Sequence, residues 1–109
     1  MDRDFIILKK SFLDWEWYDD TNMVRLYLHL LLSANFERSR WHGRTIEIGQ
    51  LITRIKKLSS ETGISEWSVR TCLGRLVKSG EITIQPTNKF TIITVCNYNE
   101  CLTPSVDTD

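Results

Sequence analysis

The segment "LSSETGISEWSVRTCLGRLVKSGEITI", residues 58–84, carries the sharpest pattern in this chain of 109 residues. Gly63 separates two stretches of helical periodicity, and glycine commonly closes a helix because it adopts positive φ without steric cost. The spacing predicts a first helix over residues 54–62, with Thr53 as its N-cap. One face of this helix holds, at i, i+3, i+4 and i+7, Ile55, Leu58, Ser59 and Thr62.

A second helix is predicted to begin after the cap residue Ser65 and to end at Gly80. Its core stripe falls at i, i+3, i+4, i+7 and i+8 and consists of Val69, Cys72, Leu73, Leu76 and Val77. Its opposite face has three cations and no acid, and consists of Trp67, Arg70, Thr71, Gly74, Arg75 and Lys78. Two helices cross steeply over a short turn when small and apolar residues meet beneath it, as Ser59 and Ile64 do here.

A longer helix is predicted upstream, over residues 21–34, with Asp20 as its N-cap. Beyond Asn22 its polar residues form one narrow stripe with a spacing of four, namely Arg25, His29 and Ser33. A helix that is apolar on nearly all other sides must be covered by its own domain or by a second copy of the chain.

Strand patterns flank the helices. "TIEI", residues 45–48, alternates as a strand does, and Gly43 and Gly49 punctuate this region. "EITIQPTNKFTIITVCNY", residues 81–98, predicts a β-hairpin with a Pro-Thr-Asn turn, in which Asn88 tolerates positive φ. "FIIL", residues 5–8, is a short β-type run, and residues 9–15 allow one helical turn.

The order helix, strand, helix, tight turn, helix and hairpin is that of a winged helix-turn-helix. The expected fold is therefore α+β and mainly α, with a small antiparallel sheet and an N-terminal strand and helix extension. We expect the extension over residues 1–20, the winged helix-turn-helix over 21–98, and a disordered tail or the start of a linker over 99–109.

In this architecture the N-terminal turns of the second helix of the pair face the base edges of DNA. Arg70 is the candidate for base readout, because its guanidinium can pair with guanine O6 and N7; the alternative is an ordinary solvated arginine. Trp67 either stacks on sugar or base or packs on a neighbouring element. The candidate DNA-binding residues are Arg54, Lys56, Lys57, Ser65, Trp67, Ser68, Arg70, Thr71, Arg75, Lys78, Asn88 and Lys89.

The formal net charge of zero hides a strong segregation along the chain. Residues 38–89 hold ten Lys and Arg against four Glu, a balance of +6, while residues 1–20 and 90–109 each carry −3. If the charges lie on separate faces, one face is free to meet phosphates. The alternative is that solvated surface charges segregate by chance.

The stretch "LDWEWYDD", residues 13–20, combines aromatics with four acids. Aromatic platforms for nucleic acid usually alternate with cations, and carboxylates would repel phosphate. We therefore expect this segment to pack on the long helix or on a second subunit rather than to bind a ligand. The packing or dimer candidates are Trp15, Trp17, Tyr18, Tyr27 and Leu31.

Five pieces of sequence together carry a family resemblance over most of residues 5–98: "SFLDWEWYDD", "VRLYLHLLLSAN", "GQLITR", residues 58–84 as quoted above, and "TNKFTIITVCNY". The chain resembles the N-terminal winged-helix domain of phage and prophage replication-initiation proteins, the replisome organisers akin to DnaD-like primosomal proteins. The resemblance implies origin or single-strand DNA engagement, self-association, and contact with a replicative helicase or its loader. That last contact is expected in a C-terminal region beyond Asp109.

Other function classes are disfavoured by the residues. His29 and His42 lie on different elements without a paired nucleophile, so we expect no enzyme, cofactor or metal site. Three cysteines without a C-x-x-C pair or a leader pattern favour a reducing compartment, with the cytoplasm as the expected location. A DNA-binding role would place the chain at the nucleoid. The apolar run 23–34 is shorter than the roughly 20 residues of a membrane span. Two alternatives stay open: a winged-helix transcriptional regulator, and a winged helix used for protein contacts.

Overall fold

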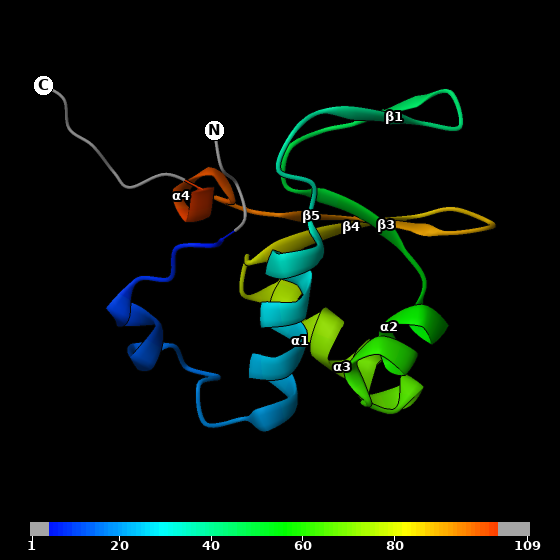
Figure 1. Ribbon diagram of the computed structural model, residues 1–109. Coiled ribbons are helices and arrows are strands. Elements are labelled where there is room, and N and C mark those ends of the chain that lie inside the picture. Colours follow the sequence, from blue (N-terminus) through cyan, green and yellow to red (C-terminus); the bar gives the residue numbers. More distant parts are fainter. Residues whose placement is uncertain (1–4, 103–109) are drawn as a thin grey trace, which may run out of the picture.

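The computed structural model describes residues 5–102, which form an α+β domain (Figure 1). The helices are η1 (Lys10–Asp14, a 3-10 helix), α1 (Thr21–Ser33), α2 (Ile55–Thr62), α3 (Glu66–Lys78) and α4 (Asn99–Leu102). The strands are β1 (Ser39–Trp41), β2 (Arg44–Ile46), β3 (Gln50–Thr53), β4 (Ile82–Pro86) and β5 (Thr91–Val95). The predicted order of helix, strand, helix, helix and hairpin is confirmed by α1, β3, α2, α3, β4 and β5, although β3 lies after the strand predicted at residues 45–48.

Three of the strands form an antiparallel sheet in the order β3-β5-β4. Thr91 at the start of β5 lies opposite both Thr53 at the end of β3 and Pro86 at the end of β4. β5 is therefore the central strand. Its consecutive residues Ile92 and Ile93, whose side chains point to opposite faces of the sheet, are both buried, so both faces are covered at this point. β1 and β2 form a separate two-stranded hairpin that projects from one end of the domain (Figure 1).

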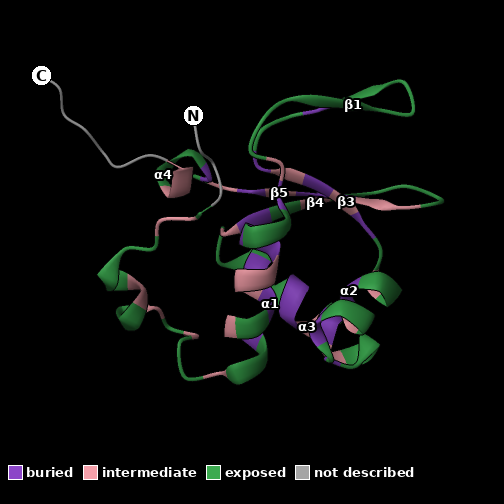
Figure 2. Cartoon of the chain, viewed as in Figure 1, coloured by how far each residue is buried: buried purple, intermediate pink, exposed green. Residues whose placement is uncertain are grey.

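The core lies where α1, α2 and α3 meet the sheet, and Figure 2 shows the buried residues turned toward that junction. From α1 the buried side chains are Met23, Leu26, Leu30 and Leu31. From α3 they are Val69, Cys72, Leu73 and Leu76, so most of the predicted stripe is confirmed.

Val77 does not belong to that stripe, since it is 42% exposed. Eight residues after Val69 a helix has rotated about 80° past it, which places Val77 at the border of the core-facing side. The prediction of Val77 as a core residue was therefore wrong.

Two of the three predicted helix caps are confirmed. Asp20 Oδ1 accepts a hydrogen bond from the Met23 amide at 3.1 Å, and Ser65 Oγ accepts one from the Ser68 amide at 3.1 Å. The cap predicted at Thr53 is wrong, because pairing with β5 holds this residue as the last of β3. Arg54 occupies the cap position of α2 and makes no side-chain capping bond.

The turn between β4 and β5 is built differently from the prediction. Positive φ among the described non-glycine residues occurs at His42 and Asn97, not at Asn88. Thr87 closes the turn instead: its amide and its hydroxyl both donate to the Phe90 carbonyl, at 2.7 and 2.8 Å. Its Oγ1 also accepts from the Phe90 amide at 3.1 Å.

The β1–β2 hairpin was missed as a unit, because residues 45–48 were the only part of this region expected to be extended. Its two-residue turn has φ of 49° at His42 and 79° at Gly43. Positive φ at both central residues is the type I′ geometry, whose twist matches that of the strands it joins. The hairpin is anchored at its base by Ile46, which is 2% exposed.

The two ends of the described chain lie against each other. The predicted helical turn near residues 9–15 is confirmed by η1, whereas "FIIL" forms no strand. The Ile7 amide instead donates to the Cys101 carbonyl at 2.7 Å, which joins the extension to α4. The tail predicted over 99–109 thus begins with a helical turn, and residues 103–109 lie outside the described range.

The glycine at position 49 supports a sharp prediction. Gly49 has φ of 86°, and a Cβ built on it would lie 2.9 Å from Tyr98 Cβ. Gly43 has φ of 79° but no heavy atom within 4 Å of such a Cβ. We expect Gly43→Ala to lower the free energy of unfolding by about 1 kcal/mol, from backbone strain alone. Gly49→Ala should lower it by about 2 to 4 kcal/mol, because overpacking adds to the strain.

Urea unfolding of both variants measures the difference. Equal losses at the two positions would contradict the contact between Gly49 and Tyr98.

Candidate nucleic-acid interface

The solvent side of α3 presents large and charged side chains. Trp67 is 75% exposed, and Arg70 and Lys78 are also exposed. Neither cation has an ion pair among residues 5–102. The three residues thus follow one another along α3 with their polar or aromatic groups free to meet a ligand.

The hydroxyl groups near the start of α3 are used within the helix. Ser65 caps it, and Thr71 Oγ1 donates to the Trp67 carbonyl at 3.2 Å. Ser68 is half-buried and contributes its amide to the cap. These candidates hold the first turns of α3 in shape, and the exposed groups there are Glu66, Trp67 and Arg70.

Arg75 differs from its neighbours on α3 because it is engaged inside the molecule. Its Nη1 lies 3.4 Å from Asp20 Oδ2, the cap residue of α1. Its guanidinium carbon lies 4.8 Å from the centre of the Trp17 ring, a cation–π contact. Arg75, a predicted phosphate contact, therefore joins α3 to the acidic extension.

The remaining basic candidates lie on α2 and on the β4–β5 turn. Arg54, Lys56, Lys57, Asn88 and Lys89 are all exposed. The three α2 cations lie near the start of α2, on the far side of the Gly63 turn from α3 along the chain. The structure thus divides the basic candidates between α3, the start of α2 and the β4–β5 turn.

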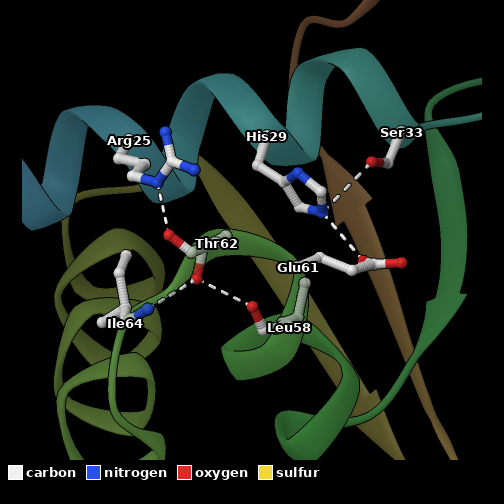
Figure 3. Close-up of polar contacts among 7 residues, drawn as sticks. All are labelled: Arg25, His29, Ser33, Leu58, Glu61, Thr62 and Ile64. Carbon is white, nitrogen blue, oxygen red and sulfur yellow. Dashed lines mark hydrogen bonds and ion pairs between the residues drawn. The ribbon is translucent and has the colours of Figure 1, made fainter.

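Polar contacts join α1 to the end of α2, next to the turn that leads into α3 (Figure 3). Arg25 Nε donates to the Thr62 carbonyl, and His29 Nε2 lies 3.0 Å from Glu61 Oε1. Ser33 Oγ lies 3.5 Å from the same ring nitrogen. The polar stripe of α1 is thus used to hold the end of α2, from which the chain turns directly into α3.

The aromatic cluster of the extension packs mainly on α1. The Trp15 and Tyr27 ring centres lie 5.1 Å apart, and Trp15 Nε1 donates to Glu81 Oε2 at 3.2 Å. Burial, followed by nearby Cys101, Glu81 and Cys96, raises the Tyr27 pKa to about 12. Leu31 is 1% exposed, whereas Tyr18 is 44% exposed and its ring meets that of Phe12 edge-on.

A second aromatic cluster, at the tip of the β1–β2 hairpin, was not among the candidates. The Trp41 ring meets Phe90 edge-on at 5.0 Å and His42 at 4.2 Å, and the Arg44 guanidinium carbon lies 5.3 Å from the centre of the Phe90 ring. The local signal was "WHGR", in which a residue that tolerates positive φ precedes glycine between extended residues.

Other kinds of site find little support in the described residues. Within residues 5–102 no three His, Cys, Asp or Glu side chains are grouped so as to hold a metal ion. Burial is the main cause that raises the pKa of the Cys72 and Cys101 thiols, which makes both poor nucleophiles near neutral pH. No helix in this range is long and apolar enough to cross a membrane.

Comparison with known proteins gives no match, whether the chain is set against protein-family models, curated proteins or solved structures. The interface must therefore be interpreted from its own geometry.

The placement of Arg75 makes a prediction that separates it from Lys78. Arg75→Ala removes a partly exposed ion pair and a cation–π contact, so we expect the free energy of unfolding to fall by about 1 kcal/mol. Lys78→Ala, which removes a cation from the same helix without such contacts, should change it by less than about 0.5 kcal/mol. Urea unfolding followed by circular dichroism measures both. Equal effects would contradict a structural role for Arg75.

Proposed function

We propose that this chain is a winged helix-turn-helix DNA-binding module that inserts α3 into the major groove and uses the β4–β5 hairpin as its wing. The observation that supports the proposal most is the combination of topology and surface. A sheet of order β3-β5-β4 is joined to two helices that meet at Gly63, and the second helix carries exposed Trp67, Arg70 and Lys78.

In this proposal each exposed residue has a separate task. Arg70 lies in the second turn of α3, within reach of base edges, where its planar fork can pair with guanine. Lys78 in the last turn and Lys89 on the wing neutralise backbone phosphates. Trp67 stacks on a sugar or base beside them.

The biological setting that the family resemblance implies is replication initiation at the nucleoid, with a helicase or loader as downstream partner. A transcriptional regulator could have the same architecture, since a fold does not determine a role. A regulator would require a two-fold operator with half-sites about one helical turn apart. Use of the domain for protein contacts alone is favoured by the net charge of zero and by Lys89 as the lone cation in the turn 87–90.

We also propose that α1 mediates self-association. Large apolar side chains are uncovered on its outer side: Leu32 of α1 is 71% exposed, and Tyr18 of the preceding extension is 44% exposed. With Val24 and Leu28 they line a groove of about 630 Å³. A second copy of the chain would bury this surface.

Removing the free cations of α3 should weaken DNA binding. We expect Arg70→Ala combined with Lys78→Ala to weaken binding to a short duplex roughly tenfold or more, through loss of one base and one phosphate contact. Lys9→Ala with Lys10→Ala is the control, since it removes two exposed cations from the extension and η1, of which Lys9 is paired with Glu100. Fluorescence anisotropy at low salt measures all three proteins. Unchanged affinity of the α3 variant would exclude this face.

The salt dependence of binding separates the DNA proposal from the protein-contact alternative. Because phosphate neutralisation releases counterions, log K should fall by several units per unit of log salt concentration. If log K does not change with salt concentration, the result favours the protein-contact alternative.

Self-association is tested by a single exposed leucine. We expect the protein to be a dimer or larger in light scattering, and Leu32→Glu to reduce it to a monomer by placing a charge on the apolar groove. Leu13→Glu, at a leucine of η1 that is 62% exposed, should leave the mass unchanged. A monomer mass for the unmodified protein at high concentration contradicts the proposal.

A further inference from the structure

A second groove lies between the β1–β2 hairpin, the β4–β5 turn and the start of α2. Its volume is about 630 Å³, and its walls include Trp41, Phe90, Thr53 and the α2 cations. Figure 1 shows the hairpin and the β4–β5 turn extending on the same side of the domain as α2. None of the α3 residues lines this groove, so it is a separate surface.

One wall of the groove is aromatic and held in position. Trp41 is 37% exposed, while its ring is fixed by the edge-on contacts with Phe90 and His42. The type I′ turn immediately after Trp41 limits the motion of the hairpin tip. A partly exposed indole held in this way loses little conformational entropy when a flat ring stacks on it.

Another part of the lining is cationic. Arg54, Lys56 and Lys57 line it, and none of them has an ion pair within residues 5–102. The one acid on the lining, Glu61, lies 3.0 Å from His29 Nε2 on α1. The cations thus outnumber the acid, and they are the groups free to meet an anion.

The groove also contains two sets of polar groups that lack side-chain hydrogen-bond partners among the described residues. The first backbone amides of α2 have no side-chain cap, and amides at a helix start attract anions. Thr53 is 4% exposed, lines the groove, and its hydroxyl has no hydrogen-bond partner among the described residues. A buried hydroxyl without a partner is uncommon unless a ligand or water satisfies it.

We propose that this groove binds an unpaired nucleobase of single-stranded DNA, which stacks on Trp41 while the neighbouring phosphates meet Arg54, Lys56 and Lys57. An aromatic platform beside cations is the arrangement that holds single strands without sequence readout. An acidic peptide would satisfy the cations but would leave the indole face unused. The inference rests on the proposed DNA-binding function, yet it uses residues separate from those of α3.

The test uses the full chain and two probes, an oligothymidylate about a dozen nucleotides long and a duplex of equal length. Trp41→Ala should weaken oligothymidylate binding about tenfold, within the range found for loss of one stacked base. It should leave duplex affinity within twofold. Trp41→Phe keeps a stacking ring and should restore most of the affinity, which excludes loss of folding as the cause.

The α3 variant Arg70→Ala with Lys78→Ala is the matched control, and it should weaken duplex binding while leaving oligothymidylate binding within twofold. If the proposed duplex function fails but this inference holds, the protein will not bind the duplex, while it still binds oligothymidylate in a way that depends on Trp41. The inference is overturned if Trp41→Ala leaves oligothymidylate affinity unchanged. Tighter binding of a glutamate-rich peptide than of the oligonucleotide would also overturn it.

Discussion

The fold depends on the turn between α2 and α3, where Thr62 and Ile64 are buried and their backbone polar groups need protein partners. Buried amides and carbonyls that lose water without such partners cost free energy. Thr62 is 4% exposed and satisfies several of these groups. Its hydroxyl donates to the Leu58 carbonyl at 2.7 Å and accepts from the Ile64 amide at 3.2 Å, while its carbonyl accepts from Arg25 Nε.

These contacts connect three helices at one point. Gly63, with φ of 78°, turns the chain directly after Thr62, and Ser59 Oγ donates to the Ile64 carbonyl across the turn. Because Arg25 belongs to α1, the direction in which α3 leaves the turn is fixed relative to the rest of the core. Which side of α3 is exposed therefore depends on the hydrogen bonds of the turn. The proposed DNA-binding surface lies on that exposed side.

Sequence periodicity predicts the parts of this molecule whose causes are local. A glycine after a helical stretch, a serine before one and an apolar stripe are decided within a few residues, and Gly63, Ser65 and Val69 behave as expected. Thr53 does not, because the pairing of β3 with β5, 38 residues later at Thr91, overrides its capping propensity. Arg75 likewise depends on Asp20 and Trp17, partners that no local pattern identifies.

The candidate surfaces likewise divide into one that local sequence predicts and one that depends on tertiary structure. Exposure of Arg70 and Lys78 follows from the stripe opposite them on α3. The groove beside Trp41 requires a hairpin, a second turn and a helix start to meet, and that meeting depends on tertiary structure. The basic and acidic parts of the chain are also in contact in the fold, since the Arg75–Asp20 ion pair joins the basic part to the acidic extension.

Amide chemical shifts of the isotopically labelled protein, followed by NMR while a short DNA duplex is added, test the central claim most directly. The account predicts that the largest shifts occur at the start of α3, residues 66–71, and at Asn88 and Lys89 of the wing. Residues of η1 and of the outer side of α1 should change little. Shifts concentrated on α1, with α3 unaffected, would contradict the assignment of α3 as the DNA-binding helix.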